Sequence, residues 1–134
     1  MMNEISRRIN VASKTVEEDL DKVGFASFVT GSTAINHNTT TDVDVVVMTS
    51  SLDAATTLLE EAGWTAGLYP WDLWRSFKKT VYGVTINILL CMSEPVFMRA
   101  KAALDACIVL RDSGVEVDKG LRISIHAAVM GGAP

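Results

Sequence analysis

Two carboxylates, Asp42 and Asp44, stand at the start of an apolar run with one residue between them, and the segment 33–41 separates them from the pair Gly31-Ser32. Side chains alternate between the two faces of a strand, so both aspartates leave the backbone on the same side. Carboxylates are costly to bury in an apolar strand unless a cation neutralises them. We therefore expect Asp42 and Asp44 to be metal ligands.

The Gly31-Ser32 pair follows the strand-like run 25–30. Glycine lets the chain turn tightly, and the backbone amides of such a turn, with the Ser32 hydroxyl, can donate to phosphate oxygens. Mg²⁺ prefers hard oxygen ligands such as carboxylates. The turn and the two acids together predict a site for nucleotide phosphates with Mg²⁺, in which Gly31 and Ser32 bind the phosphates.

The elements that must position these residues follow from the hydrophobic periodicity. Spacings of three and four predict helices over 3–23 and 52–62, the second capped by Ser50 or Ser51. A third helix is predicted to begin at Ser93 or Glu94, and Asp118 caps a fourth. Strands are predicted at 25–30, 42–48, 75–81 and 84–91, with Tyr82-Gly83 as a hairpin turn, 33–41 as a polar loop, and an edge strand followed by a turn within 64–74. This order predicts one α+β domain over residues 1–134, a mixed sheet with helices mainly on one face, and chemistry on the uncovered side.

Composition excludes several classes of protein. The net charge is -4 and the 12 basic residues are scattered, so strong non-specific binding to nucleic acid is not expected. No stretch approaches the roughly 20 apolar residues of a membrane span, and the first residues lack a signal core. Cys91 and Cys107 lie in apolar surroundings, which is typical of reduced, buried thiols. We expect a cytoplasmic protein.

The residues from Gly31 to Val47 resemble the signature of the nucleotidyltransferase superfamily that includes DNA polymerase beta: Gly-Ser, a variable loop, then acid-x-acid followed by apolar residues. In the minimal nucleotidyltransferases a Ser usually precedes the first acid, and Thr41 keeps the hydroxyl here. The predicted order of elements also fits. The resemblance implies a nucleoside triphosphate bound with Mg²⁺ and transfer of a nucleotidyl group to a hydroxyl of a protein, RNA or small molecule. Minimal members often modify a toxin partner, which makes a protein acceptor conceivable.

One position departs from this pattern. The superfamily usually has a third carboxylate on a later strand, and Asn87 stands there. An amide oxygen can coordinate a cation, but an amide cannot take a proton. Three explanations remain open: transfer with one metal and no protein base, replacement of the acid by Asp72 or Glu94, or a pseudoenzyme that keeps nucleotide or protein binding. Asn87 is therefore the catalytic position on which activity is to be judged.

Other polar and aromatic residues have two interpretations each. Lys78 and Lys79 must point to opposite faces of their strand, so at most one of them faces the site, where Lys78 could neutralise a triphosphate; an exposed edge lysine is the alternative. The alternative to metal binding is a structural role for the two acids, in which Asp42 caps or closes a turn and Asp44 forms an ion pair with a lysine. The same two interpretations apply to Arg75. His37 and His126 are expected to be ordinary polar side chains. An aromatic cluster either packs in the core, stacks on a base or binds a partner; it comprises Trp64, Tyr69, Trp71 and Trp74.

Overall fold

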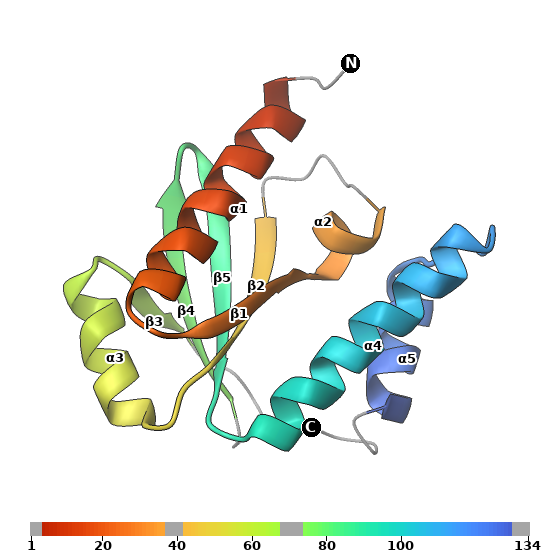
Figure 1. Ribbon diagram of the computed structural model, residues 1–134. Coiled ribbons are helices and arrows are strands. Elements are labelled where there is room, and N and C mark those ends of the chain that lie inside the picture. Colours follow the sequence, from red (N-terminus) through yellow and green to blue (C-terminus); the bar gives the residue numbers. More distant parts are fainter. Residues whose placement is uncertain (1–3, 37–41, 68–73, 130–134) are drawn as a thin grey trace.

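The computed structural model describes residues 4–36, 42–67 and 74–129. The elements, in chain order, are α1 (Glu4–Lys22), β1 (Ala26–Thr30), α2 (Gly31–Asn36), β2 (Asp42–Met48), α3 (Leu52–Glu61), β3 (Thr65–Gly67), β4 (Trp74–Val81), β5 (Val84–Cys91), α4 (Glu94–Asp112) and α5 (Lys119–Val129) (Figure 1). The described strands form a sheet in the order β1-β2-β5-β4-β3. Strands β2 and β5 are parallel and the other neighbours antiparallel, which confirms the α+β class with a mixed sheet.

Alternation along the central strands separates an apolar face from a mixed one. Every second residue of β2 and β5 is fully buried beneath α1 and α3; these residues are Val43, Val45, Val47, Ile86, Ile88 and Leu90. On the opposite face, α4 packs on the Met48–Cys91 end of the sheet, with α5 behind it (Figure 1). Since Asp42 and Asp44 alternate with the buried valines, they lie on this second face, which α4 covers only in part.

Helix ends are set by the capping residues expected from sequence. Ser51 Oγ accepts a hydrogen bond from the Ala54 amide at 3.3 Å at the start of α3. Ser93 begins α4 and Asp118 begins α5 in the same way. Each such bond satisfies an amide that has no partner within its own helix, and its loss typically costs about 1 kcal/mol. The predicted caps are confirmed.

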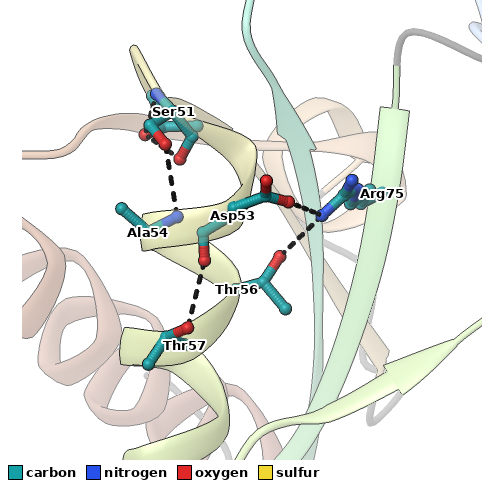
Figure 2. A network of polar contacts seen from close by, with 7 residues as sticks. Ser51, Asp53, Ala54, Thr56, Thr57 and Arg75 are labelled. Carbon is teal, nitrogen blue, oxygen red and sulfur yellow. Dashed lines mark hydrogen bonds and ion pairs between the residues drawn. The ribbon is translucent and has the colours of Figure 1, made fainter.

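Arg75 of β4 contacts helix α3 (Figure 2). These contacts lie on the face of the sheet opposite Asp42 and Asp44. Arg75 Nη1 donates to Thr56 Oγ1 at 3.0 Å and lies 3.5 Å from Asp53 Oδ1. Both charges are exposed to solvent, so the pair contributes at most about 1 kcal/mol. This arrangement directs Arg75 to α3, and it does not join the acidic site.

The connection Tyr82-Gly83 is a tight hairpin turn, as predicted. Both residues have positive φ, 51° and 76°, which matches a type I′ turn. It fixes the register that pairs Val81 with Val84 and, farther along, Lys78 with Asn87.

The prediction of a loop immediately after Ser32 was wrong. Residues 31–36 form α2, although six residues are too short for a stable isolated helix. Its Ile35 is fully buried among side chains of α4 and the segment before α5, including Leu104, Cys107 and Val117. The helix therefore depends on packing with residues distant in sequence.

Both cysteines are buried free thiols, as expected. Burial raises the pKa of Cys91 to about 11, so this thiol stays protonated and unreactive at neutral pH. Among the described helices, none combines the length and apolar character needed to cross a membrane.

Candidate functional site

A row of polar residues crosses the sheet from one edge strand inward. Thr30 of β1 pairs with Asp44 of β2, Asp44 with Asn87 of β5, and Asn87 with Lys78 of β4. Directly paired residues on neighbouring strands point to the same face. Asp42 lies two residues before Asp44 and shares that face. The topology thus brings together residues of four strands that lie between positions 30 and 87 of the sequence.

Asp44 is the half-buried centre of this row. Asn87 Nδ2 donates to Asp44 Oδ1 at 3.2 Å. Burial raises the pKa of Asp44, and the negative charge of Asp42 adds to this; the hydrogen bond from Asn87 and the positive charges of Arg122 and Lys78 act in the opposite direction. The net rise means that the protein leaves the Asp44 charge incompletely compensated.

Gly31 lies directly against the Asp44 carboxylate. Its φ is +72°, and a Cβ atom added there would lie 2.8 Å from Asp44 Oδ2. Both facts require glycine at this position. Thr33 Oγ1 donates to the Asp42 carbonyl at 3.3 Å and ties α2 to the start of β2. Ser32 is the second residue of α2, and its side chain lies outside what the structure describes.

Two buried side-chain oxygens beside Asp44, Thr30 Oγ1 and Asn87 Oδ1, have no hydrogen-bond partner among the described residues. A buried oxygen without a partner is costly and calls for an explanation such as a bound ion. Together with the carboxylates they offer oxygen ligands only, the set that Mg²⁺ favours. The residues present therefore fit a hard divalent cation, with Asp42 and Asp44 supplying the negative charge.

Arg111 anchors α2 from the far end of α4. Its Nη1 donates to the carbonyl oxygens of Ala34 at 3.2 Å and Ile35 at 2.8 Å. These carbonyls belong to the last turn of α2, where they have no partner within the helix. Arg111 thereby holds the helix that begins at Gly31, and so fixes the backbone that contacts Asp44.

The structure does not supply a third acid at this site from Glu94. Glu94 begins α4 beyond Cys91, and Asn87 lies four strand residues, about 13 Å, before Cys91. Within the described ranges, no group of three or more His, Cys, Asp or Glu could hold a metal ion. Of the three open explanations, replacement of the acid by Glu94 is therefore excluded. Asp72 lies outside the described residues, as do Thr41, His37, Tyr69 and Trp71.

Lys79 and Trp64 lie on the opposite face of the sheet from the acids. Lys79 Nζ donates to the Ala62 carbonyl at 2.7 Å and lies 5.8 Å from the centre of the Trp64 ring. Trp64 is only 8% exposed and belongs to the core under α1 and α3. A cavity of about 660 Å³ beside them does not reach Asp44. Trp64 packs in the core and cannot stack on a base held at the acids.

Two residues of the site escaped sequence reasoning. Thr30 was detectable, since it precedes Gly31 and lies on the same strand face as Phe28, but its role depends on the β1–β2 register that pairs it with Asp44. Arg122 had no local signal. Its charge reaches Asp44 only because α5 folds back onto α4 (Figure 1).

No protein-family model matches the sequence, and a search of curated protein sequences finds no significant match. Solved structures do match in shape. GrpB from Enterococcus faecalis, titled a conserved protein, aligns with a TM-score of 0.62 over 97% of this chain and 94% of its own, at 12% identity. The Cid1 poly(U) polymerase, solved with bound MgATP, aligns with a TM-score of 0.58 over 84% of this chain at 12% identity.

A cytoplasmic RNA terminal U-transferase aligns with a TM-score of 0.57 over 91% of this chain, at 14% identity. The chain has the nucleotidyltransferase fold. It spans 38% of the Cid1 chain and 37% of the terminal U-transferase chain. At these identities the likeness establishes the nucleotidyltransferase fold and nothing finer.

Proposed function

We propose that this nucleotidyltransferase-fold chain binds a nucleoside triphosphate together with Mg²⁺ at the site centred on Asp44. The observation that carries the proposal is the environment of that carboxylate. It is half-buried, its pKa is raised by burial, and Thr30 Oγ1 and Asn87 Oδ1 beside it are buried without partners among the described residues. A divalent cation at this place relieves all three costs at once.

The roles of the residues follow from their positions. Asp42 and Asp44 would hold the cation, which when bound would supply positive charge next to the phosphates. Gly31 and Ser32 would contact the triphosphate through the start of α2. Lys78, on the same face across the sheet, and Arg122 would balance the phosphate charge. Asn87 would orient Asp44 through the hydrogen bond that it already donates.

Transfer of the nucleotidyl group to a hydroxyl acceptor is the reaction that such a site would perform: the acceptor oxygen would attack the alpha-phosphorus, and inorganic pyrophosphate would leave. Asn87 limits it, since an amide neither accepts a proton nor adds negative charge. We infer slow transfer in the wild-type chain, in which the acceptor hydroxyl loses its proton without help from a side chain at position 87. An acid at that position would supply the missing base and a further anionic metal ligand.

Isothermal titration with ATP, CTP, GTP and UTP, with and without Mg²⁺, tests binding. We expect Mg²⁺-dependent binding that the double variant Asp42→Ala/Asp44→Ala abolishes. The control Glu60→Ala/Glu61→Ala removes the same charge from the exposed end of α3 and should bind as the wild type does. Absence of binding by every nucleotide, or unchanged binding in the Asp42→Ala/Asp44→Ala variant, would refute the proposal.

Alpha-labelled triphosphates and a cell extract test transfer separately. The Asn87→Asp variant should label an acceptor faster than the wild type, while Asn87→Ala should not. If Asn87→Asp binds nucleotide and labels nothing, position 87 is not the limiting feature.

Asn87 also favours a second candidate, a catalytically inactive module that acts by binding another protein. The lack of a third acid among the described residues is the observation behind it. Nucleotide binding without labelled acceptor in the wild type would favour this pseudoenzyme, and labelling by the wild type would exclude it. Labelling by Asn87→Asp alone would show that the chain lost catalysis together with its acid.

A further inference from the structure

The free edge of β1 lies in a groove between two helices. Strand β1 is the end strand of the sheet, and its described residues pair only with β2. About half of the backbone N–H and C=O groups of such a strand point outward without a strand partner. The groove has a volume of about 580 Å³ and runs from α1 across β1 to α4, the two helices that flank β1 in Figure 1.

The two walls of this edge groove differ in chemistry. On the α1 side it is lined by Glu17, Glu18 and Asp21, none of which forms an ion pair with a described residue. Burial raises the pKa of Glu17, so its charge is partly desolvated without a compensating cation.

Apart from Lys101, the α4 wall is apolar. Phe97 packs edge-on against Phe28 of β1 with ring centres 5.1 Å apart, and Met98 beside it is 55% exposed. Lys101, the cation in the groove lining, is already engaged: its Nζ bonds Asp105 Oδ1 at 3.1 Å and lies 5.6 Å from the Phe28 ring centre. It does not neutralise the acids on the α1 wall.

We propose that the edge groove binds an extended polypeptide segment in which basic and apolar residues alternate, as an added strand alongside β1. Side chains of an added strand point alternately to the two faces of the sheet. One set meets the acids of α1, and the other meets Phe97 and Met98 of α4. The free backbone edge of β1 supplies hydrogen bonds to the added strand, and the two walls favour a segment whose basic and apolar side chains alternate.

A second copy of this chain fits the edge groove less well. Antiparallel pairing of two β1 edges about a two-fold axis would extend one sheet and place both α1 helices on the same face. The acids of one α1 would then face the acids of the other, and like charges in contact disfavour association. The charge of the groove thus selects a basic partner. The proposal does not depend on nucleotide binding.

Fluorescence anisotropy with defined peptides tests the proposal on the full chain. The probe is a labelled peptide of four Lys-Val repeats. Its controls are a Lys-Lys-Val-Val repeat of equal composition, which loses the alternation, and a Glu-Val repeat. The Lys-Val peptide should bind at least about tenfold more tightly than either control. Equal binding of the two lysine peptides would overturn the alternation and leave only non-specific charge attraction.

Charge reversal on the protein locates the site. Glu17→Lys/Asp21→Lys should weaken binding of the Lys-Val peptide at least about tenfold. Glu60→Lys/Glu61→Lys changes the net charge equally on exposed α3 residues and should have a much smaller effect. Circular dichroism checks that both variants are folded. Similar weakening in both folded variants would overturn the location.

Amide hydrogen exchange gives a measure on unmodified protein. The bound Lys-Val peptide should slow exchange within Ala26–Thr30, since outward amides of β1 gain acceptors. Binding without such protection would overturn strand addition. Sedimentation of the protein alone tests whether a second copy occupies the groove. A dimer in which the amides of β1 are protected from exchange without peptide would overturn the proposal of a basic partner.

Discussion

Replacing Gly31 with alanine tests whether the Asp44 carboxylate is held by close backbone packing. Alanine at φ +72° costs about 1–2 kcal/mol in backbone strain alone. The new Cβ would also lie 2.8 Å from Asp44 Oδ2. The carboxylate must then move and weaken the bond from Asn87, which adds about 1–3 kcal/mol for a hydrogen bond to a charged group.

Gly24→Ala is the matched control. Gly24 has φ +85°, and an added Cβ would meet nothing within 4 Å, so this variant carries only the strain. We expect Gly31→Ala to unfold at a lower temperature than Gly24→Ala, by about 8 °C for a difference of about 2 kcal/mol. Thermal and urea unfolding followed by circular dichroism measure this, and titration with MgATP should show weakened binding only for Gly31→Ala. Equal destabilisation by the two variants would refute the packing argument.

Three further predictions concern the same site. Asp44→Asn should raise the free energy of unfolding by about 1 kcal/mol at pH 7, since it removes an incompletely compensated charge. Because the pKa of Asp44 is raised in the folded state, the free energy of unfolding of the wild type should rise as the pH falls through that raised pKa. In urea unfolding, the extra stability of Asp44→Asn over the wild type should therefore vanish below the ordinary carboxyl pKa of 3.8. Mg²⁺ affinity, measured by titration, should weaken as the pH falls through the raised pKa of Asp44, since the protonated carboxyl is a poor ligand; an affinity independent of pH would place the cation elsewhere. Arg111→Ala should lower the free energy of unfolding by about 1–3 kcal/mol by leaving the Ala34 and Ile35 carbonyls without their donor, with partial rescue by Arg111→Lys; unfolding within about 0.5 kcal/mol of the wild type would show that water replaces the guanidinium.

Local sequence signals were sufficient for most of the fold. Ser51, Ser93 and Asp118 are capping residues whose effect lies within four residues of their own position, and the periodicity of β2 and β5 is visible along a single strand. Apart from α2, the element types followed from such short-range rules, and the mixed sheet followed from the order of the elements. The shared face of Asp42 and Asp44 followed from strand alternation in the same way.

Parts of the site that depend on long-range contacts were not predictable. Helix α2 looked like a polar loop because its stability comes from Ile35 packing against α4 and from Arg111. Arg122 became a neighbour of Asp44 only through the docking of α5. Asn87 was recognised from its strand context, but its hydrogen bond to Asp44 required the β2–β5 register.

The anchoring of α2 by Arg111 has a consequence for the order of events during synthesis. The bond from Arg111 to Ile35 joins residues 76 positions apart, so Gly31, Asp44 and Asn87 are all translated before the residue that fixes their geometry. A chain still lacking α4 lacks both the Arg111 donor and the apolar residues against which Ile35 packs. The proposed nucleotide site is therefore completed only after the C-terminal helices have left the ribosome, and a ribosome-bound chain that ends before Arg111 should not retain nucleotide.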